Sequence, residues 1–505
     1  MDYIIKKLGW ENAAQLAKSS RNIYNDYMAW NIQVVIVSAI RSPNFNTTDK
    51  LIELWLELQK EKVNTKLVDK QINCLEDFHL NILEEKILCS KSKIVNVIKE
   101  SFILLRQNID FFIENNAKKI IPTSQNDYSI EIQSWELFSI LWFGEAVSCR
   151  VFSSVVDSTA TIWVISKSID LSNIITEWSL SWKNEKEIFQ ILSTQLSQII
   201  EEKVIWGYIP VLSGYIGTFE QGIESAVWRG YSDATAAICT VWLANKWHNV
   251  IFEIQKSVKW LLSCDPRILE NSDDAQLIPE LDYLTAREIT WDCWAQAKLL
   301  HHQTLRSEVQ EAWVKIHLFD PFSWSDGSWI VHKNREENQW EKCSWVSFIG
   351  GRENVIFFSI SSWKMFENGI LSKLFWVVKK YFWVDIVSAS ETEVSFTIDW
   401  CWVDKDRLEK MVEEIRKEFG MWENNGIEFI EYRKNKSLIF CVGQHMKNYV
   451  WLLARATRIL GENDINIEIA SQWRLQRAMI FWIEQKDMKK AVNVLHKEFI
   501  KQNKE

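Results

Sequence analysis

The sequence predicts an α/β protein in which a mostly parallel central sheet is sandwiched by helices and is followed by two small βαββαβ units. Two observations lead to this class. In the first half of the chain, short β-branched runs alternate with longer helix-like runs, a pattern typical of a parallel sheet covered on both faces. In the last third, a pattern of helix, turn and strand occurs twice, which indicates a duplicated unit.

The elements of the first part are expected from their periodicity. Strands are short and β-branched, as in QVVIVSAI, and helices repeat their apolar residues every three to four positions. The expected elements are strands at 3–7, 33–40 and 206–216, and helical segments at 12–28, 74–120 and 233–246.

The amino-acid composition changes near residue 320. Residues 322–338 are polar and contain an Asp-Gly turn signal, so we predict a linker there. Beyond it, ILSKLFWVVKKYFWVDIVSAS (370–390) resembles WLLARATRILGENDINIEIAS (451–471). In each copy an amphipathic helix leads into an alternating strand, at 384–390 and 465–471, which predicts two copies of one supersecondary unit.

Composition excludes several classes of protein. The net charge of −9 argues against nucleic acid as a partner, because such partners favour a basic surface. The 9 cysteines are odd in number and form no CxxC pair, so a disulfide framework or zinc knuckle is not expected and a reducing cytoplasm fits best. No uncharged apolar run reaches the roughly 18 residues of a membrane span.

Four clusters suited to phosphate follow predicted strands or precede predicted helices. Glycine after a strand lets backbone N–H groups approach an anion, and a helix N-terminus adds positive potential. A lysine can neutralise charge on a transferred phosphoryl group. The clusters are KLGW (7–10), SAIRS (38–42) with TTD (47–49), GYIGT (214–218) with WRGYSD (228–233), and SCDPR (263–267).

Taken in order, these clusters resemble motifs of the aspartate kinases in the amino-acid kinase family, over nearly the whole chain. KLGW resembles Lys-Phe-Gly-Gly, ILWFGEAVS (140–148) resembles Ile-Leu-Ser-x-Gly-Glu-x-x-Ser, and GYIGT resembles Gly-Phe-Ile-Gly-Thr. WRGYSD resembles the highly specific Gly-Arg-Gly-Gly-Ser-Asp, SCDPR resembles Thr-x-Asp-Pro-Arg, and AKLLH (297–301) resembles Ala-Lys-Val-Leu-His. The C-terminal repeat resembles paired ACT regulatory domains.

The resemblance implies a domain plan and an activity. It implies an amino-acid kinase catalytic domain at 1–332 and two ferredoxin-like ACT domains at 340–432 and 433–505. The activity would be transfer of the γ-phosphoryl group of Mg-ATP to the side-chain carboxylate of L-aspartate, giving 4-phospho-L-aspartate, the first step toward lysine, threonine and methionine. Mg2+ would be held mainly by the nucleotide phosphates.

The resemblance also implies roles for individual residues. Glu136 is an alternative to Glu145, because SWELFS also fits the Gly-Glu-x-x-Ser pattern if Trp135 stands for glycine. The implied residues are Lys7 and Asp233 for catalysis; Ser38, Thr48, Glu145, Arg229 and Ser232 for aspartate; and Lys7, Gly9, Trp10, Gly230, Arg267 and Lys298 for ATP.

Paired ACT domains imply control by an end-product amino acid, lysine or threonine or both, and a homodimer or higher homo-oligomer formed through these domains. No nucleic acid and no membrane partner is expected. The implied effector residues lie in a loop before a helix and at a strand end; they are Met365, Gly369, Asp385, Ser390 and Glu391.

Two other functions stay open at this point. QKS at 255–257 replaces the family's Trp-Thr-Asp, so the adenine pocket is not assigned. One alternative is therefore a catalytically impaired homologue that only senses amino acids. The other is a different amino-acid kinase that phosphorylates another carboxylate.

The tryptophan content is abnormal. The chain has 29 Trp and 15 Gly, whereas about 7% glycine, roughly 35 residues, is usual at this length. Several tryptophans stand where the resembled family has glycine: Trp10, Trp30, Trp228, Trp260, Trp294, Trp451 and Trp473. An indole fits poorly where a phosphate or a positive φ needs glycine. We hypothesise that the gene contains UGA codons that its host translates as glycine.

Overall fold

The computed structural model divides into two compact units. The first unit comprises Met1–Trp260 with Gln303–His332, and the second comprises Leu261–His302 with Lys333–Glu505. The residues that the structure describes are 3–8, 16–29, 31–42, 45–58, 60, 63–86, 91–116, 135–159, 165–171, 185–205, 207–214, 231–246, 249–255, 261–290, 300, 302–320, 323, 326–332, 346–362, 365, 369–382, 384, 386–399, 405–419, 428–444, 446, 449–472 and 477–501.

The first unit is built on a twisted sheet with β1 in its interior. Neighbouring strands from β5 to β9 run parallel, which confirms the predicted parallel sheet, and β10 pairs antiparallel with β9. The strands of the sheet that belong to the first unit follow the order β5 (Ser166–Ile169), β6 (Ile209–Ser213), β2 (Ile32–Val37), β1 (Tyr3–Leu8), β7 (Val250–Gln255), β9 (Lys315–Phe319) and β10 (Ser328–Val331).

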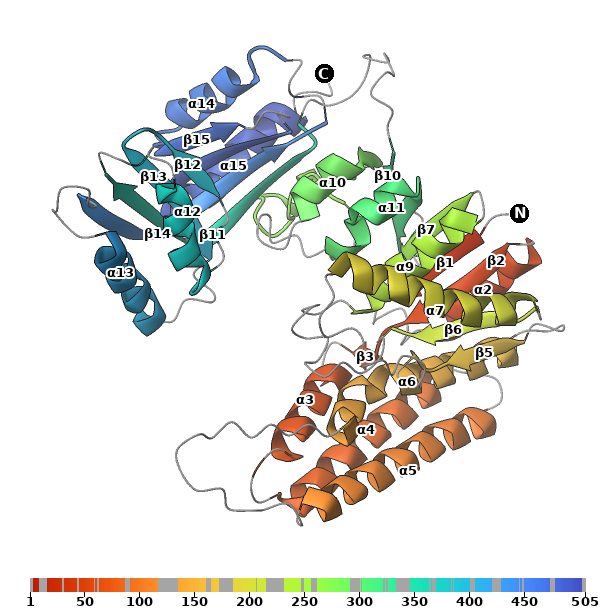
Figure 1. Ribbon diagram of the computed structural model, residues 1–505. Coiled ribbons are helices and arrows are strands. Elements are labelled where there is room, and N and C mark those ends of the chain that lie inside the picture. Colours follow the sequence, from red (N-terminus) through yellow and green to blue (C-terminus); the bar gives the residue numbers. More distant parts are fainter. Residues whose placement is uncertain are drawn as a thin grey trace, which may run out of the picture. The chain divides into compact units, whose positions relative to one another are not determined.

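Helices cover both faces of this sheet (Figure 1). Helices α2 (Leu16–Met28) and α6 (Trp135–Thr159) pack together on one face, and α7 (Glu185–Ile205) and α9 (Tyr231–Lys246) pack together on the other. The remaining elements of the unit are β3 (Arg41–Ser42), β4 (Phe45–Asn46), α3 (Thr47–Leu58), α4 (Thr65–Lys86), α5 (Lys91–Asn116), the one-turn helix His302–Leu305 and α11 (Ser307–Glu311).

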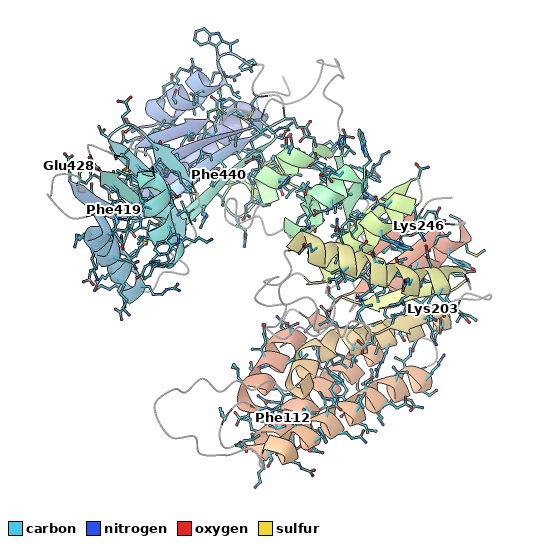
Figure 2. The ribbon with its side chains drawn as sticks, viewed as in Figure 1. Phe112, Lys203, Lys246, Phe419, Glu428 and Phe440 are labelled. Atoms are coloured by element: carbon cyan, nitrogen blue, oxygen red, sulfur yellow. The ribbon has the colours of Figure 1, made fainter. Side chains whose placement is uncertain are left out.

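Helices α3, α4, α5 and α6 lie side by side as a bundle below the sheet in Figure 1. The predicted helical segment at 74–120 is thus confirmed as helical in its described residues, 74–86 and 91–116, which belong to two helices, α4 and α5. The bundle has an apolar core; Phe112 of α5, labelled in Figure 2, is one of its buried side chains. Within the described residues, no helix is long and apolar enough to cross a membrane.

One sequence prediction is wrong in part. The polar stretch at 322–338, expected to be a linker, contains strand β10, which pairs with β9. Gly327 of the Asp-Gly pair takes a φ of 75°, directly before β10. The next residues alternate between buried and half-buried positions, so a strand of only 4 residues forms where the composition as a whole is polar.

The second unit contains a six-stranded sheet in the order β12-β13-β11-β14-β16-β15. The predicted duplication is confirmed, because the order strand, helix, strand, strand, helix occurs twice, from β11 to α13 and from β14 to α15. The elements are β11 (Phe348–Ser361), α12 (Ile370–Lys379), β12 (Val387–Ala389), β13 (Glu393–Asp399), α13 (Lys405–Phe419), β14 (Phe429–Val442), α14 (Leu452–Glu462), β15 (Ile469–Gln472), β16 (Ala478–Glu484) and α15 (Met488–His496).

The two repeats share the long strands β11 and β14. The first half of β11 pairs with the second half of β14, next to β16, whereas its second half pairs with β13 and with the first half of β14. Ile349 accordingly lies in a core with Ile439 and Leu495, whereas Phe358 lies in a separate core with Leu374 and Ile415. The domain boundary predicted at 432/433 falls within β14, a strand that both repeats share.

The segment 261–302, between β7 and β9 in sequence, belongs to the second unit. It contains the one-turn helix Ser272–Asp274, strand β8 (Glu280–Asp282) and helix α10 (Tyr283–Thr290). Arg477 donates to Asp282 at 2.5 and 2.7 Å and to the Thr285 hydroxyl at 2.6 Å, and thus fixes the start of α10. The chain ends in a one-turn helix, Gln485–Asp487, before α15, and a π-helical turn, Lys497–Lys501, after it.

We predict an acid-sensitive bundle core because of His79. This α4 side chain is buried beside Phe102, and burial lowers its pKa from 6.5 to about 4. A histidine whose pKa is lower in the folded state stabilises the fold above pH 6.5, and that contribution is lost as the pH falls. At pH 5 the loss should be about 2 kcal/mol.

The measurement is urea unfolding of the wild type and His79→Leu at pH 7.5 and pH 5. The variant should lose about 2 kcal/mol less stability between the two pH values than the wild type does. An identical loss in both proteins would contradict a buried, neutral imidazole.

Candidate active site

The carboxyl ends of β1, β2 and β6 meet the N-terminus of α9 in the first unit. Ligands bind at such strand ends in open α/β sheets. Here the Lys7 Nζ of β1 lies 2.8 Å from the Asp233 Oδ1 of α9, and both side chains are less than one tenth exposed. Asp233 also lies in the first turn of its helix, where the helix dipole favours an acidic side chain.

A serine pair adjoins this ion pair. The Ser38 hydroxyl, directly after β2, donates to the Ser232 hydroxyl at 2.7 Å, and both residues are buried. The predicted residues Lys7, Ser38, Ser232 and Asp233 are therefore brought together from three separate motifs, and Ser38 and Ser232 are 194 positions apart in sequence.

Gly214 allows this close approach. It follows β6, and its N–H donates to the Val37 carbonyl at 3.1 Å. A Cβ placed on Gly214 would lie 2.5 Å from the Ser232 Cβ and 3.0 Å from the Glu145 Oε2. Sequence analysis had placed this glycine in a phosphate cluster, but only the structure assigns it a packing role between the end of β6, Ser232 and Glu145.

Glu145 of α6 lies at the same edge of the sheet, half-buried. Ser148, one turn along the helix, accepts a hydrogen bond from the Ile40 N–H at 3.0 Å and so fixes the loop after β2 to α6. Sequence analysis did not select Ser148, although it is the last residue of the quoted Gly-Glu-x-x-Ser motif. Glu136 also lies in α6, but its side chain is outside the described residues.

Thr48 lies in the first turn of α3, where its N–H donates to the Asn46 side chain at 3.1 Å. The helix is anchored beside this site, because the Thr47 hydroxyl donates to the Ile40 carbonyl and a Cβ on Gly144 would lie 2.8 Å from the Thr47 Cγ2. Thr48 therefore directly follows a residue that is anchored to the loop after β2, and its own side chain is half-buried.

Arg267 lies in the second unit, on the segment 261–302. Its guanidinium is 82% exposed and donates to both oxygens of Asp265, at 2.6 to 3.1 Å. Burial raises the pKa of Asp265, but the hydrogen bonds from Arg267 outweigh it and the net pKa is lowered. Asp265 thus holds the arginine in place, and the exposed guanidinium presents N–H donors to solvent.

Several predicted residues lie outside the described part of the chain. They are Gly9, Trp10, Arg229, Gly230, Lys298 and Asp385.

The other predicted effector residues lie around the first repeat of the second unit. Met365 is buried in its core, and Gly369 caps α12 with a φ of 91°. The Ser390 hydroxyl accepts from the Glu393 N–H at 3.1 Å in the turn between β12 and β13, and Glu391 in the same turn is exposed. These contacts stabilise a turn, and the assignment of an effector to it stays a prediction.

The first-unit cluster combines a buried ammonium, a buried carboxylate and two hydroxyls at the edge of a parallel sheet. An ammonium group has three N–H donors, so Lys7 can keep its contact with Asp233 and still donate to an anion. In the described residues, no group of three or more His, Cys, Asp and Glu side chains is placed to bind a metal ion. The arrangement is suited to binding and neutralising a phosphate group.

We predict that Gly214→Ala destabilises the first unit by about 1–3 kcal/mol, because its methyl group would collide with the backbone and side chain of Ser232. The control is Gly461→Ala in α14, where nothing lies within 4 Å of the added Cβ. That variant should be neutral or stabilise its own unit by up to about 1 kcal/mol. Thermal unfolding measures both, and a Gly214→Ala protein as stable as the wild type would contradict the packing described here.

Comparison with known proteins gives consistent matches over the chain. The model of the amino acid kinase family matches residues 11–307, and an ACT domain model matches residues 439–499. An aspartate kinase of Gibberella fujikuroi is 23% identical over 98% of this chain and 95% of its own length. The aspartokinase of Schizosaccharomyces pombe is 25% identical over 72% of this chain and 68% of its own length.

Solved structures share the fold. The aspartate kinase of Clostridium acetobutylicum superposes with a TM-score of 0.70 at 20% identity, covering 99% of this chain and 100% of that one. Aspartokinase III of E. coli, solved with aspartate and ADP, gives 0.68 at 17% identity, covering 98% and 99%. With a family model matching more than half of its length, the chain belongs to the amino acid kinase family.

Proposed function

We propose that this protein is an aspartate kinase, which transfers the γ-phosphoryl group of ATP to the side-chain carboxylate of L-aspartate. The observation that carries the proposal is the buried Lys7–Asp233 pair beside Ser38 and Ser232 at the strand ends. The aspartokinases among the similar proteins, together with the ACT match, favour aspartate over other carboxylates as the acceptor.

In this mechanism catalysis rests on positioning and charge neutralisation, and no covalent enzyme intermediate is needed. Lys7 donates to the transferring phosphoryl group, where negative charge accumulates. Asp233 holds the ammonium in place through its 2.8 Å contact, and the helix N-terminus behind it adds positive potential. Ser38 and Ser232 supply hydroxyls at the same edge.

The substrates occupy opposite sides of the phosphoryl group. We assign the ammonium of aspartate to Glu145 and its α-carboxylate to Arg229, because a guanidinium fork matches a carboxylate. Thr48 helps to seat the substrate. Gly9, Trp10 and Gly230 lie in the motifs assigned to the nucleotide, and Arg267 and Lys298 donate to its phosphates. Mg2+ would be held mainly by those phosphates and would neutralise part of their charge.

The second unit is assigned a regulatory role. An end-product amino acid, lysine or threonine, would bind near Met365, Gly369, Asp385, Ser390 and Glu391. One structurally similar protein, E. coli aspartokinase III, was solved with lysine and aspartate. We further assign the protein to the cytoplasm, to a homo-oligomer formed through the ACT domains, and to the route toward lysine, threonine and methionine.

We predict that Lys7→Met lowers kcat by about 10²–10³-fold, because a donor aimed at the developing charge is lost. Asp233→Asn should also lower kcat. The matched control is Lys203→Met: Lys203 of α7, labelled in Figure 2, pairs with Glu202 at 2.7 Å and should leave kcat unchanged. The assay is formation of aspartyl hydroxamate from ATP, aspartate and hydroxylamine.

The same assay separates the alternatives. A folded wild type that binds an effector amino acid but forms no hydroxamate would be an amino-acid sensor. One that consumes ATP only with another acidic substrate would be a different amino-acid kinase. Either result overturns the proposed function.

We also propose that some of the printed tryptophans are glycines in the natural protein, through UGA codons read as glycine. The structure adds an observation at Trp313, two residues after α11. This residue has a φ of 56° and a side chain 60% exposed, at the position after a helix that glycine usually occupies. The other non-glycine residues described with positive φ are Asn and Asp, which tolerate it.

We predict that Trp313→Gly is more stable than Trp313→Ala by about 1 kcal/mol, because only glycine is unstrained at this φ. At Trp376, an exposed position inside α12, the order should reverse by a similar amount. Comparing Gly with Ala at each site cancels the loss of the indole's contacts, and thermal unfolding gives the differences. If Ala is the better residue at both sites, residue 313 does not need glycine. The nucleotide sequence tests the recoding hypothesis directly, because UGG at every tryptophan codon would rule it out.

A further inference from the structure

The loop that contains Asp265 and Arg267 is held by the C-terminal helix of the chain. Three side chains of α15 and of the turn after it contact the segment 261–274. They are Asn493, His496 and Lys501, and each makes a polar contact with this segment.

The contact at His496 is the most buried. Its Nε2 lies 2.9 Å from the Ser263 hydroxyl, at hydrogen-bond distance, and each of the two residues is 2% exposed. Burial lowers the pKa of His496, so the imidazole is neutral and offers one donor and one acceptor. A polar contact shielded from water in this way is costly to remove.

Ser263 is itself a junction of the loop. Its hydroxyl accepts from the Gln276 N–H at 2.9 Å, its N–H donates to the Gln276 carbonyl at 2.8 Å, and its carbonyl accepts from the Ile349 N–H of β11 at 2.8 Å. The neighbouring Cys264 lies in the same apolar core as Leu495 of α15. Ser263, two positions before Asp265, therefore has hydrogen-bond partners at its hydroxyl, its N–H and its carbonyl.

The far side of the loop is fixed by Asn493. Its side chain accepts from the Glu270 N–H at 2.9 Å and donates to the Ile268 carbonyl at 3.1 Å. Beyond it, Lys501 pairs with Asp274 at 2.6 Å. Asp265 and Arg267 thus lie between two anchored points, Ser263 and Ile268, and both anchors involve the same helix.

We propose that α15 positions this loop for the nucleotide, and that His496 and Asn493 are positioning residues for ATP binding. The proposal rests on the proposed function, in which Arg267 donates to the ATP phosphates. Within the described part of the chain, the exposed guanidinium pairs with Asp265 of its own loop, so the loop backbone sets the direction of the guanidinium. Loosening either anchor should then weaken the nucleotide's binding and leave the aspartate-binding residues of the first unit unchanged.

The test is steady-state kinetics of the full chain with His496→Phe, His496→Gln and Asn493→Ala. His496→Phe should raise KM for ATP about tenfold, the equivalent of one buried hydrogen bond, with KM for aspartate and kcat nearly unchanged. His496→Gln keeps a polar group at the ring position and should recover most of the loss. Asn493 is only half-buried, so its variant tests the second anchor if His496→Phe folds poorly.

Val492→Ala is the matched control. Val492 is buried in the same helix and in the same apolar core as Cys264, but its side chain is apolar and packs against Gly351 of β11, so the variant removes packing and keeps both polar anchors. This variant should lower stability without raising KM for ATP. An equal rise in KM for ATP with Val492→Ala, or no rise with either His496→Phe or Asn493→Ala, overturns the proposal.

Two further measurements separate this proposal from the proposed function. Arg267→Ala should raise KM for ATP, and adding His496→Phe to it should raise KM little further, because both act through one loop. Calorimetric titration with a non-hydrolysable ATP analogue repeats the comparison without turnover. An inactive wild type contradicts the proposed function alone; a wild type that binds the analogue no better than His496→Phe contradicts the positioning role.

Discussion

The register of β1 is the constraint on which the first unit depends. Lys6 and Lys7 are consecutive, so their side chains point to opposite faces of the sheet. Lys7 meets Asp233 of α9, whereas Lys6 meets Asp26 of α2 at 2.5 Å and Glu253 of β7 at 2.6 Å. A slip of one residue would move one lysine into the place of the other and put Ile5 or Leu8 where the second lysine should be, so the carboxylates on one face would lose their cation.

The two lysines have the same chemistry but different surroundings. Burial alone would lower the pKa of Lys6, but Glu253 and Asp26 raise it, so the charge is kept and is matched by two carboxylates. Removing one partner from a buried ion pair typically lowers the free energy of unfolding by about 3–5 kcal/mol. Within the described residues, Lys7 pairs with a single carboxylate, that of Asp233, at a strand end, and this unequal neutralisation is what suits Lys7, and not Lys6, to binding an anion.

Much of this was predictable because it is local. A β-branched run predicts a strand, and the motif at the end of the run shows which side chain lies at the strand's end, as with Lys7 and Ser38. The pairing of Ser38 with Ser232 followed only from a resemblance, since no local pattern links positions so far apart. The shared strands β11 and β14 were missed because each half is a good strand by itself, and only tertiary pairing shows that the halves lie in different cores. Strand β10 was missed because its 4 residues are too few to show a period against a polar background.

The least predictable feature is that residues 261–302 belong to the second unit, and it bears on how the protein could be regulated. The contacts that hold this segment, such as Arg477 with Asp282, join residues almost 200 positions apart. A ligand that shifts the ACT sheet would therefore act first on the segment that contains Arg267, whereas Lys7, Ser38 and Asp233 belong to the other unit. Under the proposed roles of Arg267 in ATP binding and of the second unit in effector binding, the effector and ATP would be coupled more directly than the effector and aspartate. Linkage then requires the reverse as well: whatever factor the effector applies to ATP affinity, ATP applies to the effector's.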